Sequence, residues 1–154
     1  DILLIDTAAG ISSNVMYFNT SAQEIMVVVS PEPTSITDAY ALMKVLSLKY
    51  SQKNFKMVVN LAANSEESRE VFRQLSLVAD RFLDITIEYM GHILIDKNIT
   101  KSVRKQKIVS EIMPDTDASK CFVTLAKNIC NSTVQTYPDG ETNFIWKYLL
   151  RNDF

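Results

Sequence analysis

Continuous runs of apolar, mostly β-branched residues, separated by segments with helical periodicity, constrain this chain more than any other feature. Three short runs cover Ile2–Ile5, Ile25–Val29 and Phe55–Val59, and a longer fourth run covers Ile85–Ile95. The first three runs are continuous rather than alternating, which is typical of strands that are buried on both faces of a sheet. We therefore predict that these four segments are strands of one sheet.

The segments between these runs carry apolar residues at spacings of three and four, the period of a helix with one buried face. We expect Asn64 and Asp117 to cap the second and third of these helices. Strands that alternate with helices in this way predict an α/β fold of three layers, a mostly parallel sheet flanked by helices. The three apolar stripes are Ile36, Ala39, Tyr40, Met43, Leu46 and Tyr50; Val71, Phe72, Leu75, Val78, Ala79 and Phe82; and Ala118, Cys121, Phe122, Leu125 and Ile129.

Composition excludes several classes of protein. With 16 basic and 18 acidic residues the net charge is −2, which gives no overall attraction to nucleic acid. Only three glycines are present, at positions 10, 91 and 140, and they are isolated, so no glycine-rich phosphate loop lies within this sequence. No apolar run is long enough to cross a bilayer.

The two cysteines, Cys121 and Cys130, are expected on one helix. Their separation of nine residues is two and a half helical turns, which places them on opposite sides. A disulfide within that helix is therefore excluded, and no cysteine and histidine cluster indicates a metal site. We expect two buried free thiols in a reducing cytoplasm.

Ligands of open α/β sheets bind outside the carboxyl ends of the strands, and polar residues gather there in this sequence. The first run leads into Asp6 and Gly10. A carboxylate at the end of a strand can hold a water of Mg²⁺, and a glycine four residues later lets backbone N–H groups approach a terminal phosphate. The alternative is that Asp6 only caps a helix that begins near Ser12 or Ser13.

Asn60 follows the third run, and its carboxamide can donate and accept hydrogen bonds at once, as the edge of an adenine requires. The alternative is a turn residue leading to Asn64. Asp96 ends the fourth run. His92 lies beside Gly91 within that run, with no partner in sequence, and is expected to be a structural histidine.

A cluster of four cations, Lys101, Arg104, Lys105 and Lys107, follows the fourth run. We interpret it as a solvated helix face, with a surface for a partner or a phosphate group as the alternative.

The end of the chain differs from the rest. Residues 132–143 are polar and predict a linker, followed by a short amphipathic segment over 144–154. On a helical wheel its apolar residues cover about 240°, while Lys147 and Arg151 share the remaining sector. Such a helix suits a membrane interface, and the alternative is docking on its own domain or on a second subunit. The membrane-facing residues would be Phe144, Ile145, Trp146, Lys147, Tyr148, Leu149 and Leu150.

Longer motifs resemble one family. Residues 5–11 (IDTAAGI) are similar to switch II of the MinD/ParA group of P-loop ATPases, and residues 31–44 resemble the loop and helix of its flagellar-number regulators, the FlhG, FleN or YlxH branch. Val59 and Asn60 resemble the branch's adenine-contacting strand end, and residues 91–106 resemble its glycine, strand-end aspartate and following helix. The match continues through residues 118–127 and covers nearly the whole chain.

The resemblance implies roles for these residues. Asp6 would serve Mg²⁺ through water, Gly10 would face the γ-phosphate with Thr7 in the same motif, and Asn60 and Asp96 would flank the adenine. It also implies that the final helix targets the membrane. The family's Walker A loop, switch I aspartate and N-terminal activator segment would all precede residue 1, so residues 1–131 would form only the C-terminal part of a MinD-like domain.

The function expected from the resemblance is an ATP-dependent regulator of bacterial flagellar number or placement. It would bind ATP or ADP with Mg²⁺, dimerise with ATP, attach reversibly to the inner face of the cell membrane and contact flagellar regulators or basal-body components. This chain alone would not hydrolyse ATP. The alternatives are a non-catalytic protein-binding module that keeps half of the ATPase sheet, and a partitioning ATPase in which Arg104 would meet DNA, which the net charge disfavours.

Overall fold

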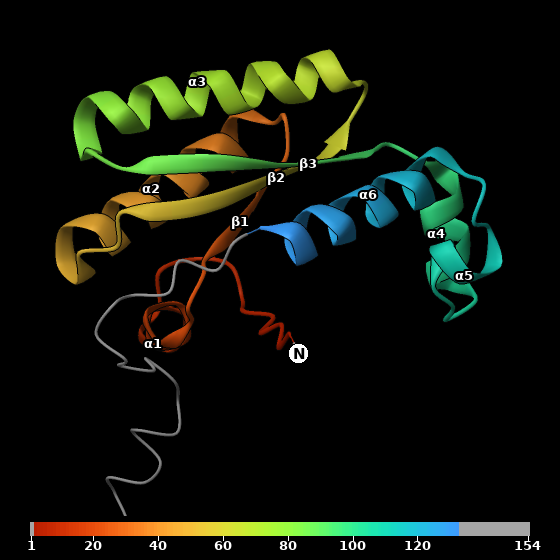
Figure 1. Cartoon of the computed structure of the whole chain (residues 1–154), viewed down its shortest axis with the longest axis horizontal. Coiled ribbons are helices and arrows are strands. Elements are labelled where there is room, and N and C mark those ends of the chain that lie inside the picture. The colour runs from red at the N-terminus through yellow and green to blue at the C-terminus, as the bar shows by residue number, and fades with distance from the viewer. Residues whose placement is uncertain (1, 133–154) are drawn as a thin grey trace, which may run out of the picture.

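The structure, a computed structural model, describes residues 2–132 (Figure 1). The predicted amphipathic segment and all but the first residue of the predicted linker lie outside the described residues, so both stay predictions. In chain order the elements are α1 (Ser13–Ser21), β1 (Met26–Val29), α2 (Pro33–Tyr50), β2 (Asn54–Ala62), α3 (Ser65–Leu83), β3 (Thr86–Leu94), α4 (Lys97–Arg104), α5 (Val109–Ile112) and α6 (Asp117–Asn131).

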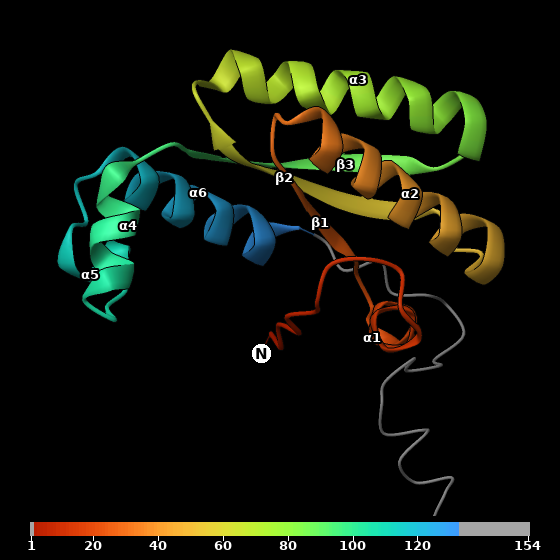
Figure 2. The same ribbon diagram turned by 180° about the vertical axis from the view of Figure 1, so that it is seen from behind.

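The three strands form one parallel sheet in the order β1-β2-β3, which confirms the predicted α/β class. Val29 pairs with Val59, and Val59 pairs with His92 on the other side. The strands follow one another across the sheet in the same order as in the sequence. Because crossovers between parallel strands are right-handed, α2 and α3 must then lie on the same face. Figure 2 shows both helices on that face and α6 on the other.

Each face of the sheet has its own apolar core. The core under α2 and α3 includes Met43, Leu46, Met57 and Leu75, and it also takes in Val15 of α1. The second core lies under α6 and joins Val58 and Met90 to residues of α4 and α6. The three predicted layers are therefore present.

The predicted first strand is wrong. Residues 2–8 form no strand, and Leu4 is 76% exposed. A strand exists only through ladder hydrogen bonds to a neighbour, and within residues 2–132 no strand pairs with this segment. An apolar, β-branched composition alone does not supply that partner.

Burial on both faces is confirmed for β2, whose residues from Phe55 to Val59 are all buried. For β1 it is wrong, because Val28 is 60% exposed. Val28 lies on the face of α6, but α6 packs mainly over β3, and Met26 is the residue of β1 that joins the core beneath it (Figure 1). The same kind of sequence thus has two environments, set by which helix lies above it.

Helix details also differ from expectation. Asn64 caps α3 by accepting a hydrogen bond from the Glu67 N–H, as predicted, but α6 is capped by Thr116 rather than Asp117. The residues at the centre of each predicted apolar stripe are buried or half-buried. Four residues at the edges of the stripes are instead exposed to solvent: Tyr50, Val78, Phe82 and Phe122. The cysteines share α6 as expected, but neither is buried, since Cys121 is half-buried and Cys130 exposed.

Candidate functional site

The carboxyl ends of β2 and β3, together with the first turns of the helices that follow them, form the rim at which a ligand of this fold would bind. The end of β3 stays joined to β2, because the Ile95 N–H donates to the Ala62 carbonyl at 2.9 Å. Helices α3 and α4 begin at this rim, so their positive dipole ends face it. The rim therefore favours anionic or polar ligands.

Asn60 stands on a β-bulge. Val59 pairs with His92 and Ala62 with Leu94, so β2 has one residue more than β3 between the two pairs. Leu61 takes up the extra residue at φ 57°, a left-handed conformation that is uncommon for a bulky side chain. Bulges of this kind redirect side chains and are frequent beside active sites.

The bulge also fixes the Asn60 carboxamide. Its Oδ1 accepts the Leu61 N–H at 2.9 Å, which leaves the second lone pair of that oxygen available. Its Nδ2 donates no hydrogen bond within residues 2–132. The half-buried amide therefore keeps one donor group and one acceptor site for a ligand, as an adenine edge requires.

Asp96 joins the first turns of two helices. Its Oδ1 accepts the Asn98 N–H of α4 at 2.7 Å, and its Oδ2 accepts the Ala118 N–H of α6 at 3.4 Å. The hydrogen bond from Asn98 is the main reason why the pKa of Asp96 lies below its ordinary value of 3.8. Asp96 is thus at the rim, directly after β3, and its oxygens already accept hydrogen bonds from the two helices.

Asp6, Thr7 and Gly10 lie in the segment that leads into α1. Figure 1 shows this segment beside α1, below the sheet in that view, whereas the carboxyl ends of β2 and β3 lie near the starts of α3 and α4. The Asp6 carboxylate is exposed and forms no hydrogen bond or ion pair with the described residues. The structure therefore places Asn60 and Asp96 toward the carboxyl ends of neighbouring strands and places these three residues in a different segment, so the proposed roles of all five stay predictions.

Gly10 has φ 97°, which favours glycine, and a side chain at this position would meet no atom within 4 Å. The constraint on Gly10 is therefore the backbone angle alone. The helix that follows is capped by Ser12, whose side chain accepts the Val15 N–H, so the alternative role of Asp6 as that cap is excluded.

Sequence reasoning missed a hydrogen-bond chain on the α3 side of the sheet. The Tyr89 hydroxyl lies 2.7 Å from the Ser68 Oγ and 3.0 Å from the His92 Nδ1. Residues three apart on a regular strand point to opposite faces, but a second irregularity at Gly91, with φ 136°, returns Tyr89 and His92 to one face. The histidine is structural, as expected, and its partner is hidden in sequence because the bulge breaks the period of two.

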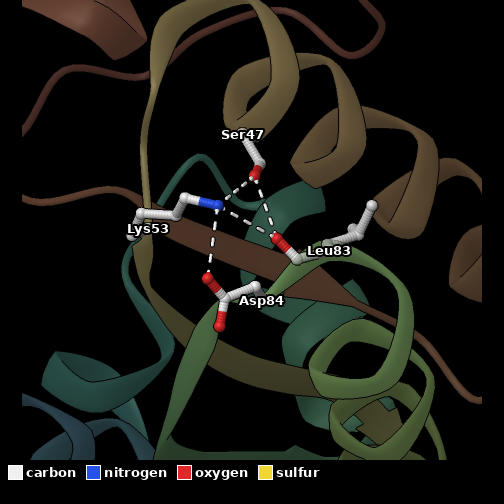
Figure 3. Close-up of polar contacts among 4 residues, drawn as sticks. All are labelled: Ser47, Lys53, Leu83 and Asp84. Carbon is white, nitrogen blue, oxygen red and sulfur yellow. Dashed lines mark hydrogen bonds and ion pairs between the residues drawn. The ribbon is translucent and has the colours of Figure 1, made fainter.

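Two lysines at the amino end of the sheet were also missed. In Figure 3 Lys53 points toward the ends of α2 and α3, where its Nζ donates to the Leu83 carbonyl at 3.1 Å and to the Ser47 Oγ at 3.4 Å. Asp84 adds an ion pair at 4.0 Å, and the Ser47 hydroxyl donates to the Leu83 carbonyl at 3.3 Å. Lys53 therefore ties the start of β2 to the last carbonyl of α3.

Lys56 is more deeply buried, with only 10% of its side chain exposed. Its Nζ lies 2.7 Å from the Glu24 Oε1 and 2.7 Å from the Ser132 Oγ, so it joins the loop before β1 to the end of α6. No sequence pattern marks this lysine, because it falls within an apolar strand where an aliphatic residue is the usual choice.

Neither a membrane span nor a metal cluster is found among the described residues. None of the helices within residues 2–132 has the length and hydropathy needed to cross a bilayer. Within the same range no group of three or more histidine, cysteine, aspartate or glutamate side chains could together hold a metal ion.

A family model described as 4Fe-4S iron sulfur cluster binding proteins, NifH/frxC family, matches residues 9–151. The chain is 40% identical over 152 residues to the antiactivator FleN of Pseudomonas aeruginosa, which covers 99% of this chain and 54% of that protein. It is 31% identical over 116 residues to the flagellum site-determining protein YlxH of Helicobacter pylori, which covers 75% of this chain and 39% of that protein. The chain thus spans about half or less of these relatives.

The cysteines of this chain do not fit the iron–sulfur cluster in that family description. Such a cluster takes four thiolates, and this sequence has two cysteines. Cys121 and Cys130 are separated by nine residues of one helix, about 13 Å along its axis and on opposite sides. They cannot both reach one small cluster, so no cluster chemistry is assigned to this chain.

Proposed function

Because this chain belongs to the NifH/frxC family and, within the MinD/ParA-like ATPases, to the FleN and YlxH branch, we propose that it is part of an ATP-dependent regulator of bacterial flagellar number or placement. The observation that carries this proposal is the 40% identity to the antiactivator FleN over nearly the whole chain. The second relative is named as a flagellum site-determining protein, and the first as an antiactivator.

At the rim, the proposal assigns ligand binding to side chains that the fold already holds in place. The Asn60 carboxamide, fixed on the bulge, would bind the adenine edge, and Asp96 would border the base while it anchors α4 and α6. Asp6 would hold Mg²⁺ through water, with Thr7 and Gly10 near the phosphates. Bound ATP would supply the terminal phosphate that keeps two copies of the protein together, and loss of this phosphate by hydrolysis would separate them.

The same proposal places the protein reversibly at the inner face of the cell membrane. Its last residues combine aromatic and aliphatic side chains from Phe144 to Leu150 with Lys147, the composition of an interfacial helix. Flagellar regulators or basal-body components would be its protein partners. We further propose that residues 1–154 alone hydrolyse no ATP, because no glycine-rich phosphate loop lies within them.

The adenine assignment can be tested in the gene product that contains this sequence. Asn60→Ala should weaken ATP binding by about tenfold and leave GTP binding unchanged, because one good base contact contributes about 1–1.5 kcal/mol. Isothermal titration calorimetry measures both affinities. Asn54→Ala is the matched control, since Asn54 begins the same strand at its opposite end.

Equal losses for ATP and GTP would show that Asn60 supports the rim without reading the base. The flagellar function is tested separately by deleting the gene and counting flagella by electron microscopy. A deletion strain with unchanged number and placement, under conditions in which the wild-type gene is expressed, would contradict the proposed regulation.

One observation favours a second candidate, a protein-binding module. Helices α2 and α3 expose large apolar side chains, with Leu48 at 67%, Leu77 at 65% and Phe82 at 64%. Exposed apolar patches on soluble proteins often mark interaction sites. If the gene product binds no nucleotide but still changes flagellar number, this candidate replaces the ATPase.

A further inference from the structure

Helix α4 and the turn after it carry a row of positive charge. Residues Lys97 and Lys101 lie four apart, and Arg104 and Lys105 follow at the next helical spacings, so these side chains share one side of the helix. Lys107 extends the row beyond the helix. All five cations are exposed, and no aspartate or glutamate occurs from residue 97 to residue 110. We call these five residues the basic ridge.

The basic ridge has no acidic partner in the part of the chain that the structure describes. The three ion pairs within residues 2–132 all involve other cations, and in the ridge only Lys101 makes a side-chain hydrogen bond, at 3.3 Å to the Asn98 Oδ1. The negative end of the α4 dipole stabilises the charges of Lys101 and Arg104, which lie in the last turn of the helix. It does not explain why two further cations, Lys105 and Lys107, follow the helix without an acidic partner among residues 2–132.

Two exposed apolar side chains lie near these cations in sequence. Val103 is 67% exposed and Ile108 60% exposed, each next to ridge residues in sequence. The turn between them is well defined, because the N–H groups of Lys105 and Lys107 both donate to the Ser102 carbonyl and Gln106 has φ 54°. The ridge therefore ends in a turn with a defined backbone, and Val103 lies about 100° or more around α4 from the ridge cations.

We propose that the basic ridge is a second membrane contact, which binds the anionic headgroups of a phospholipid bilayer while Ile108, next to Lys107, enters the interface. Charge complementarity favours an anionic bilayer, because the five exposed cations have no acidic partner among residues 2–132. This inference rests on the membrane association in the proposed function. Cations near an anionic bilayer add to its binding, and short lipid-binding elements become stable anchors only with a second signal.

The fold allows both elements to reach one surface. Ile99 of α4 and Leu125 of α6 pack in the same core, on the face of the sheet opposite α2 and α3 (Figure 1). Helix α6 has 15 residues and is about 22 Å long, whereas a 12-residue linker over 132–143 can span up to about 40 Å. The linker is therefore long enough to bring the final segment back along α6 to the ridge.

The test is co-sedimentation of the ATP-loaded gene product with vesicles of phosphatidylcholine, with or without phosphatidylglycerol. Replacing Lys101, Arg104, Lys105 and Lys107 by Gln should lower the affinity for anionic vesicles at least about tenfold and reduce its salt dependence, without changing binding to neutral vesicles. The matched control replaces four exposed cations on the opposite face by Gln: Lys44, Lys49, Arg73 and Arg81. It should bind both kinds of vesicle like the wild type.

Each other outcome overturns the inference in a distinguishable way. If the wild type binds anionic vesicles and the ridge variant binds them equally well, the ridge is not a membrane contact. If the control variant loses as much, net charge rather than the ridge is responsible. If a soluble acidic polypeptide binds the ridge while vesicle binding is unaffected, the partner is a protein. If the wild type binds no vesicle, the proposed membrane association fails as well. Unfolding curves that match the wild type exclude misfolding of the ridge variant.

Discussion

The lysines at the amino end of the sheet and those of the basic ridge carry the same charge in opposite circumstances. Lys53 and Lys56 are each held by several oxygen atoms that belong to separate elements of the fold. The ridge cations project into solvent with no acidic partner among residues 2–132. Substituting the partnered lysines should therefore lower the stability of the fold. Substituting the ridge cations should instead weaken ligand binding and leave stability unchanged.

Burial decides how much each partnered lysine matters. The Lys56 side chain is 10% exposed and faces a glutamate that is one-third exposed, whereas Lys53 is about half exposed and its aspartate lies fully in solvent. Ion pairs that water screens contribute little to stability, while a buried pair is costly to break on one side only.

The largest effect is expected for Lys56→Ala. It removes a buried stem and leaves Glu24 and Ser132 without their partner, so the free energy of unfolding should fall by about 2–3 kcal/mol. Urea denaturation followed by circular dichroism measures the change. Lys56→Met keeps the apolar stem and should lose about half as much; equal losses for both variants would mean that the charge, not the packing, carries the whole effect.

A pH-dependent effect is expected at the other end of the sheet, for Asp96→Asn. Folding lowers the pKa of Asp96 below its ordinary value of 3.8. The charged carboxylate therefore stabilises the folded protein fully at pH values above 3.8, and this stabilisation is lost as the pH falls through the lower pKa of the folded state. The variant keeps an oxygen that can accept the Asn98 N–H but has no proton to gain. Its stability should therefore fall less than that of the wild type on acidification.

Melting temperatures at neutral and acidic pH give the comparison for Asp96. Asp115→Asn is the control, because that exposed carboxylate accepts no hydrogen bond from the described residues. If the two variants respond to acid alike, the helix anchor contributes nothing specific to acid sensitivity.

The smallest effect is expected for Lys53→Met. The Ser47 hydroxyl still donates to the Leu83 carbonyl, so the end of α3 keeps one of its partners. The free energy of unfolding should fall by about 0.5–1 kcal/mol in thermal or urea unfolding. A loss as large as that of Lys56→Ala would remove the distinction between exposed and buried pairs that the comparison draws.

Sequence periodicity predicted the parts of the fold whose partners are local or repeated. Strand β2 and the centres of α2 and α3 follow from continuous apolar runs and from spacings of three and four. The segment Ile2–Ile5 did not become a strand, because pairing depends on a neighbour that composition cannot specify. Val28 is exposed for the same reason, since a helix above it is a fact of tertiary structure.

The rim residues could be located from sequence because parallel strands bring their carboxyl ends to one edge. Asn60 and Asp96 meet this expectation. The bulges at Leu61 and Gly91 could not be located, since each depends on the register between two strands. Their consequences, the fixed carboxamide and the contact between Tyr89 and His92, were therefore invisible in the sequence.

The two hydrogen bonds of Asp96 also link two helices. One carboxylate accepts an N–H group from the first turn of α4 and another from the first turn of α6, so both helices begin at the same point of the rim. The basic ridge lies on α4, and Ser132 follows the last residue of α6. A ligand that displaced Asp96 would therefore break a hydrogen bond at the start of each helix at once.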